Sequence, residues 1–190
     1  MLRKKPSFAY RSQPLMNNAW LKVRKKEPWP RFFLKLGILT VLIVLAAWVL
    51  SSRYALAFDF QRERCLDGSR LMIIDLDDRA PRRGEVFAFR APDLSPIFLE
   101  GTSMAKVVRA LPGDRVRISS DAKIFVNEAE VASGFPYAEK LGHVAGDFAR
   151  EFIVPSDAVL VLGTTESSFD GRYWGPLQVE RLRGRAYQLF

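Results

Sequence analysis

An apolar segment near the N-terminus constrains the fold of this 190-residue chain more than any other feature. Residues 32–50 are apolar apart from Lys35, and a helix needs about 20 such residues to cross the hydrocarbon core of a bilayer. Segment 1–35 contains ten Lys or Arg residues and one acidic residue, Glu27. Because positively charged flanks stay in the cytoplasm, the sequence predicts a basic cytoplasmic tail over 1–31, a single-pass anchor over 32–50 and an extracytoplasmic domain over 51–190.

A cleaved signal peptide is the alternative to an anchor. Ala55 and Ala57 are small enough to precede a cleavage site. However, the charged region before the apolar segment is about thirty residues long, which is more than a signal peptide carries. We therefore favour the anchor.

The basic residues are concentrated in the tail. The whole chain has 29 Lys and Arg against 21 Asp and Glu, and its pI is about 9.9. Beyond segment 1–35, 19 basic and 20 acidic residues remain, so the rest of the chain is close to neutral. A basic tail suits orientation in the membrane and contact with anionic lipid, and we expect no nucleic-acid partner.

Residues 51–190 show the pattern of a single, mainly β domain. Short segments rich in β-branched or aromatic residues alternate with turn formers such as 112–114, Pro-Gly-Asp. Many short strands leave edges that need cover, so we expect an open or barrel-like domain of antiparallel strands. Loops are expected over 91–101 and 133–151, with a short helix over 138–141. The expected strands are 69–75, 85–90, 104–110, 115–119, 123–127, 158–163 and 184–190.

One predicted strand places a lysine among apolar residues. Side chains in 104–110 alternate between the two faces, so Lys106 shares its face with Val108 and Ala110. Burial disfavours an ammonium relative to a neutral amine, and a neutral amine is what a general base needs. Lys106 is therefore a candidate catalytic base. The alternative is a lysine on an edge strand whose ammonium reaches water.

Three blocks of sequence follow the apolar segment in order. Residues 83–90 read RGEVFAFR, Lys106 lies eight residues before Asp114 of a Leu-Pro-Gly-Asp turn, and residues 168–175 read SFDGRYWG, followed by Gly-Arg-Ala at 184–186. With these blocks the chain resembles the type I signal peptidases (family S26), most closely the branch associated with conjugative transfer (TraF-type). The resemblance implies a signal-peptidase-like β domain after one transmembrane helix, and an endopeptidase that works without a cofactor.

The resemblance also implies roles for individual residues. In that family a lysine deprotonates a nucleophilic serine without help from histidine, and Lys106 matches the lysine. Ser168 would orient the Lys106 ammonium, and Asp170 and Arg172 would form a supporting ion pair. The alternative for the last two is a surface turn with an ion pair worth about 0 to 1 kcal/mol.

The chain departs from the family at the nucleophile. The family block is Ser-Met-Pro or a close variant shortly after the anchor, and the nearest match here is Cys65-Leu66-Asp67. The attacking atom would then be the sulfur of Cys65, the only cysteine in the chain, and a nearby cation favours the thiolate. The alternatives are a cysteine with no catalytic role and a cysteine in an intermolecular disulfide.

Other residues compete for roles in the site. Ser69 is the alternative nucleophile, because it could present its hydroxyl at a strand start. Ser103 precedes a methionine, as the family serine does, but alternation sends it to the opposite face from Lys106. The only histidine, His143, is expected on the surface, with a Cys–His pair as the alternative. Glu63 occupies the position of a second oxyanion donor in some family members. One Cys and one His cannot build a zinc site without several carboxylates, so no metal is expected.

Together with the predicted anchor, the resemblance implies a membrane-bound endopeptidase of the bacterial inner membrane, with its active site on the outer side. Its partners would be exported precursor polypeptides cleaved at small residues. In the TraF-type branch these are pilin or other transfer-apparatus precursors, and an amine can replace water and close a ring. The alternative is a catalytically inactive subunit of a transfer apparatus with the same fold, whereas a soluble self-cleaving repressor is disfavoured by the anchor. The oligomeric state is left open.

Overall fold

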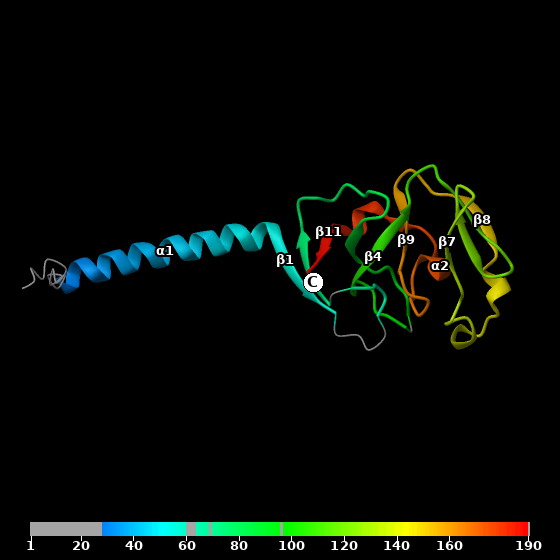
Figure 1. The fold of residues 1–190 in the computed structure, drawn as a ribbon, viewed down its shortest axis with the longest axis horizontal. Helices are drawn as coiled ribbons and strands as arrows, with labels where there is room; N and C mark the ends of the chain where they lie inside the picture. Colours follow the sequence, from blue (N-terminus) through cyan, green and yellow to red (C-terminus); the bar gives the residue numbers. More distant parts are fainter. Residues whose placement is uncertain (1–27, 60–63, 69, 96, 190) are drawn as a thin grey trace, which may run out of the picture. The chain divides into compact units, whose positions relative to one another are not determined.

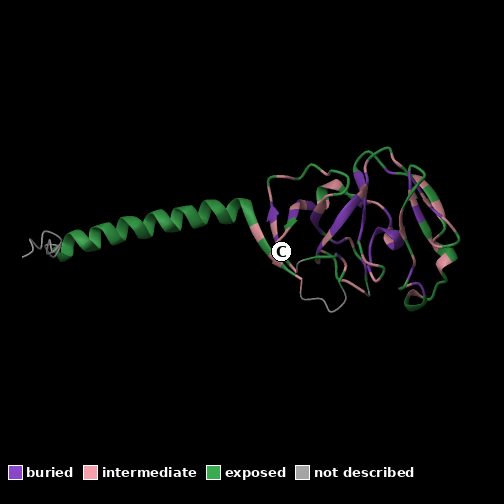
Figure 2. Ribbon diagram, in the orientation of Figure 1, coloured by how far each residue is buried: buried purple, intermediate pink, exposed green. Residues whose placement is uncertain are grey.

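The computed structural model describes residues 28–59, 64–68, 70–95 and 97–189. The chain divides into two units, residues 1–43 and 44–190, and helix α1 (Trp29–Arg53) contains the boundary. No residue of α1 is buried (Figure 2), and the helix is long and apolar enough to cross a membrane. Its 25 residues extend over about 37 Å, more than the about 30 Å of a hydrocarbon core. The predicted apolar segment 32–50 lies within this helix.

The second unit is built from two antiparallel sheets (Figure 1). One has seven strands in the order β1-β2-β11-β3-β4-β9-β10, and the other has four in the order β7-β6-β5-β8. This architecture confirms the expected mainly β domain after an N-terminal apolar helix. The strands are β1 (Tyr54–Phe58), β2 (Leu71–Asp75), β3 (Val86–Arg90), β4 (Ser103–Ala110), β5 (Arg115–Ile118), β6 (Lys123–Val126), β7 (Ala129–Ser133), β8 (Arg150–Ile153), β9 (Ala158–Leu162), β10 (Leu177–Gln178) and β11 (Leu182–Gln188).

Four of these strands, β1, β7, β8 and β10, lie outside the predicted set. β1 follows α1 directly, and Ala55 and Ala57, which suggest a cleavage site in the sequence, pair with β2 as part of an edge strand. β8 occupies the end of the predicted loop 133–151 and pairs with β5. The predicted helix over 138–141 is a single 3-10 turn, η1 (Glu139–Leu141). Each missed strand pairs with one of the predicted strands β2, β6, β5 and β9, and strand formation depends on such pairing more than on composition alone.

The turn between β4 and β5 connects the two sheets. Gly113 has a φ of +86°, a left-handed conformation that favours glycine. Asp114 accepts three hydrogen bonds of 2.6 Å, from the backbone N–H of Leu111 and from the side chains of Asn127 and Arg83. Burial opposes ionisation of this carboxyl, but the three donors outweigh it and lower the pKa of Asp114. The turn therefore fixes the point at which β4 ends.

Two apolar clusters pack on opposite faces of the seven-stranded sheet. In β3, Phe87 and Phe89 belong to the larger cluster and Ala88 to the smaller one, as the alternation along a strand requires. The larger cluster also includes Val116 and Ile124 of the four-stranded sheet, so it joins the two sheets (Figure 2). This packing links the two sheets of the second unit through one shared core.

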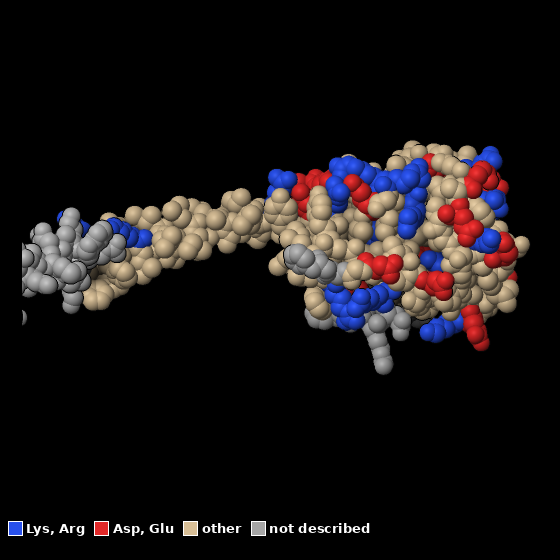
Figure 3. Space-filling view, in the orientation of Figure 1, with Lys and Arg blue, Asp and Glu red and all other residues tan. Residues whose placement is uncertain are grey.

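Charged side chains of both signs cover the second unit. Figure 3 shows Lys and Arg interspersed with Asp and Glu over the face in view. Ion pairs join some of them, including Arg82 with Asp78 at 2.9 Å and Arg185 with Glu85 at 2.8 Å. This mixture agrees with the near-balanced charge of the sequence beyond residue 35.

Candidate active site

Lys106 is buried on β4, on the face that strand alternation predicts. It is 2% exposed, and Met104 and Val108 on the same face belong to the larger apolar cluster. Its Nζ donates a hydrogen bond of 2.8 Å to Oγ of Ser168, which is fully buried. Because β4 lies between β3 and β9, Lys106 is not on an edge strand. The lysine ends against another buried polar group and not in water.

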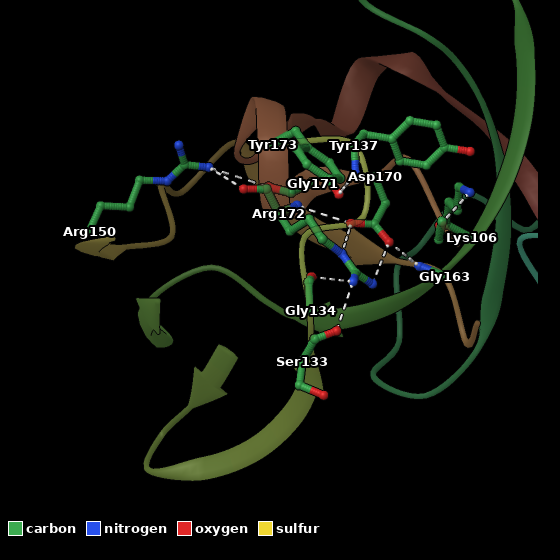
Figure 4. Close-up of polar contacts among 11 residues, drawn as sticks. Lys106, Ser133, Gly134, Tyr137, Arg150, Gly163, Asp170, Gly171, Arg172 and Tyr173 are labelled. Carbon is green, nitrogen blue, oxygen red and sulfur yellow. Dashed lines mark hydrogen bonds and ion pairs between the residues drawn. The ribbon is translucent and has the colours of Figure 1, made fainter. Parts of the chain in front are cut away.

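Asp170 and Arg172 form a buried ion pair and not an exposed turn. Asp170 is 0% and Arg172 1% exposed. Nε of Arg172 lies 2.8 Å from Oδ1 of Asp170, and Nη2 lies 3.1 Å from Oδ2. Nη1 of Arg172 donates to the carbonyl oxygens of Ser133 and Gly134 at 3.0 and 2.8 Å (Figure 4). These further hydrogen bonds are what a buried ion pair needs to offset desolvation.

The ion pair supports the loop that leads to Ser168. Oδ2 of Asp170 accepts a hydrogen bond of 2.8 Å from the backbone N–H of Gly163, directly after β9. A Cβ at position 163 would overlap Oγ of Ser168 and the carbonyl oxygen of Cys65. Only glycine allows so close an approach. The ion pair, Ser168 and the segment that carries Cys65 therefore meet at Gly163.

Cys65 lies on a segment that is held by the same loop. The backbone N–H of Thr164 donates to the Cys65 carbonyl oxygen at 3.0 Å, and the N–H of Asp67 donates to Oγ1 of Thr164 at 2.7 Å. Oγ1 of Thr165 donates to the carbonyl oxygen of Arg64. One loop thus contacts both the Cys65 segment and, through Ser168, Lys106.

Cys65 and Lys106 line the same cavity, which has a volume of about 300 Å³. Much of its wall is apolar, and Ala57, Ala88 and Ala105 contribute small side chains from three different strands. A partly apolar cavity with a few polar groups is typical of a binding site. Larger apolar residues such as Phe89, Phe98 and Met104 complete the wall, so the cavity suits small apolar side chains.

The other sequence candidates do not add to this arrangement. Ser69 and Glu63 lie outside the described residues, so the roles expected of them stay predictions. Ser103 is exposed at the start of β4 and borders the cavity. His143 is exposed, with Nδ1 3.2 Å from Oδ2 of Asp147, and does not line the cavity. Within the part of the chain that the structure describes, no group of three or more His, Cys, Asp or Glu could hold a metal ion.

The sequence analysis does not find the loop residues that hold the site together. Gly163, Thr164 and Thr165 lie between a predicted strand and the 168–175 block, and no motif marks them. The hydrogen bonds of the two threonines to residues 64 and 67 span 101 and 97 positions in the chain. The one available signal is a glycine at the end of an apolar strand, which often marks a close approach of another backbone.

Comparisons of the whole chain with known proteins point to one family. The family model described as "Signal peptidase, peptidase S26" matches residues 29–190. The "Probable signal peptidase I-2" of Synechocystis sp. is 30% identical over 178 residues, which cover 88% of this chain and 77% of that protein. Signal peptidase I of Pseudomonas fluorescens is 31% identical over 134 residues, covering 56% of this chain and 45% of that protein. A crystal structure of a signal peptidase I from Enterococcus faecalis V583 covers 57% of this chain and 97% of that chain, at 24% identity and a TM-score of 0.36. On the family model and the Synechocystis relative, the chain belongs to the signal peptidase family, peptidase S26.

Proposed function

We propose that this protein is a membrane-anchored endopeptidase that cleaves exported precursor polypeptides at small residues, with Cys65 as nucleophile and Lys106 as general base. The observation that carries the proposal is the cavity of about 300 Å³ lined by both side chains. Membership of the signal peptidase family supports peptide-bond hydrolysis as the reaction class. The large apolar residues of the cavity wall, among them Phe89, Phe98 and Met104, restrict the room for a substrate side chain and support a preference for alanine-sized residues.

In the proposed reaction, the neutral amine of Lys106 accepts the proton of the Cys65 thiol. The sulfur attacks the carbonyl carbon of the scissile bond, and the leaving amine takes the proton back from the Lys106 ammonium. A thioester remains on Cys65. Water then attacks the thioester with Lys106 again as base, which releases the acyl fragment as a carboxylic acid and restores the thiol.

Ser168, Asp170 and Arg172 are positioning residues in this proposal. The hydrogen bond of 2.8 Å from Lys106 to Ser168 restricts where the amine can point. The Asp170–Arg172 pair holds Gly163, next to which Ser168 and the Cys65 carbonyl pack. Locking a catalytic side chain through its neighbours in this way keeps the base in line with its nucleophile.

Helix α1 supports the anchor in this proposal, since it is long and apolar enough to span a bilayer. We propose a single pass through the bacterial inner membrane. The basic tail would lie in the cytoplasm against anionic lipid, and residues 51–190 outside. The resemblance to the TraF-type branch supports two finer proposals, that the precursors are pilins or other conjugative-transfer proteins and that an amine can take the acyl group to close a ring.

The test uses the full-length protein in detergent micelles with a precursor that carries an Ala-X-Ala site. We expect Cys65→Ala and Lys106→Met to abolish cleavage, and Cys65→Ser to retain part of it because a hydroxyl can replace the thiol. Ser103→Ala, which alters another residue bordering the cavity, is the matched control and should cleave like the wild type.

Two results would contradict the proposal in different ways. Normal cleavage by Cys65→Ala would remove Cys65 as the nucleophile, and loss of cleavage in Ser69→Ala would then assign that role to Ser69. If the wild type cleaves no precursor, and cells that carry Cys65→Ala still perform conjugative transfer normally, the protein is better explained as a catalytically inactive structural subunit.

Alkylation of the thiol tests the Cys65–Lys106 pair without any substrate. A lysine close to the thiol promotes the reactive thiolate. The rate of Cys65 alkylation should therefore rise at a lower pH in the wild type than in Lys106→Met. Identical profiles for the two proteins would show that the residues do not interact.

A further inference from the structure

Arg183 lies at an irregularity in β11, where it borders both the cavity described above and a neighbouring surface hollow. The pairing of β11 with β3 shifts register between Leu182 and Gly184, which leaves Arg183 as the extra residue. Such a bulge can re-aim a side chain, and bulges are frequent next to active sites. Arg183 lines the cavity that also contains Cys65 and Lys106. A Cβ at Gly184 would overlap the carbonyl oxygen of Asp75, so close packing against β2 holds the bulge in place.

The charge of Arg183 is not neutralised by the residues that the structure describes. Arg183 is half-buried, and within the described ranges it makes no hydrogen bond or ion pair. Three other arginines line the neighbouring surface hollow together with Arg183, and each has a partner. Arg181 forms an ion pair with Glu100 at 3.3 Å, Arg90 donates to the Gly101 carbonyl oxygen at 2.9 Å, and Arg79 donates to the Leu76 carbonyl oxygen at 2.9 Å.

The surroundings of Arg183 favour an anion. Arg79 and Arg90 of the hollow donate to neutral carbonyl oxygens and keep their positive charge, and Glu180 lines the hollow with them. The largely apolar wall of the cavity strengthens any ion pair formed against it. A guanidinium also matches a carboxylate with two parallel hydrogen bonds. Asp59 lines the same cavity and would repel an anion placed beside it, so only part of the cavity suits one.

We propose that Arg183 determines specificity by binding an acidic side chain of the precursor close to the scissile bond. This inference rests on the proposed peptidase function and adds a substrate class to it: precursors with a small residue at the cleavage site and an Asp or Glu within a few residues of it. The acidic preference is expected at the substrate position that reaches Arg183.

The experiment measures kcat/KM of the full-length protein in detergent micelles on a set of peptides. Each peptide has the Ala-X-Ala site and carries Asp, Asn or Lys at one position around it, with all other positions uncharged. At one position we expect Asp to be cleaved about tenfold faster than Asn, equivalent to about 1.4 kcal/mol. Arg183→Gln should lose this ratio, and Arg183→Glu should prefer Lys at the same position.

Arg185→Gln is the matched control. Arg185 lies on the same strand, forms an ion pair with Glu85 and does not line the cavity. The control variant should keep the tenfold preference for Asp. Arg183→Glu should gain activity on the peptide that carries Lys. An unfolded variant could not gain activity, so this result excludes unfolding as the cause of the lost preference for Asp.

Two outcomes overturn the inference. Cleavage of the uncharged peptides with no preference for Asp at any position, or a preference that persists in Arg183→Gln, would overturn the role of Arg183 while leaving the peptidase function intact. No cleavage of any peptide by the wild type would refute the proposed function, and the role of Arg183 with it.

Discussion

The buried ion pair between Asp170 and Arg172 offers the sharpest test of how the site is held together. Asp170→Asn changes one oxygen to an amide nitrogen and removes the charge. Among the described residues, Asp170 accepts hydrogen bonds of 2.8 to 3.1 Å from the backbone N–H groups of Gly163 and Arg172 and from Nε and Nη2 of Arg172. An asparagine has one acceptor oxygen for these donors, and its amide group would face N–H groups.

The expected loss of stability is large because the guanidinium stays buried without its counter-ion. Removing one partner of a buried ion pair costs about 3–5 kcal/mol. In a domain of this size each kcal/mol lowers Tm by about 2–4 °C, so we expect a decrease of about 6–20 °C. A double variant, Asp170→Asn with Arg172→Met, should recover part of the loss because no uncompensated charge remains.

Thermal unfolding of the full-length protein in detergent, followed by near-ultraviolet circular dichroism, measures these changes. The matched control is Glu130→Gln, which breaks an exposed ion pair with Lys123 of 3.5 Å and should cost less than about 1 kcal/mol. A Tm of Asp170→Asn within about 1 °C of the wild type would refute the reasoning, because a loss of about 3–5 kcal/mol leaves no room for so small a change.

Three further substitutions test the surroundings of the site. Ser168→Ala should lower kcat about a hundredfold without unfolding the protein, since a lysine misplaced by about 1 Å can cost that much; a kcat within twofold of wild type would contradict a positioning role for Ser168. Gly163→Ala should destabilise the domain and slow cleavage, because its Cβ would overlap Ser168; a stable and fully active variant would refute the close packing. Asp114 has a lowered pKa in the folded protein, so its contribution to stability is present above the unfolded value of about 4 and is lost as the pH falls below it. Denaturant titrations between pH 2 and 6 should therefore show a smaller acid loss of stability in Asp114→Asn than in the wild type, and equal slopes would contradict this.

Much of the fold could be predicted from local sequence patterns. The apolar segment 32–50 lies in α1, and the strands with strong alternation, such as β4, were placed within one or two residues. β1, β7, β8 and β10 could not be predicted in this way. Each of them is an end strand of its sheet that pairs with one of the predicted strands β2, β6, β5 and β9, and this pairing contributes more than the preference of the segment itself.

The sequence by itself determined which chemical groups the protein possesses: one thiol, a lysine among apolar residues, and the Ser168, Asp170 and Arg172 block. These follow from residue identity and from the two-residue period of a strand, which are local properties. Only the tertiary structure decided that Lys106 ends on Ser168, that the ion pair is buried, and that a bulge brings Arg183 to the same cavity as Cys65. Each of these depends on contacts between segments far apart in the chain, such as the close approaches at Gly163 and Gly184, and a local pattern carries no information about such contacts.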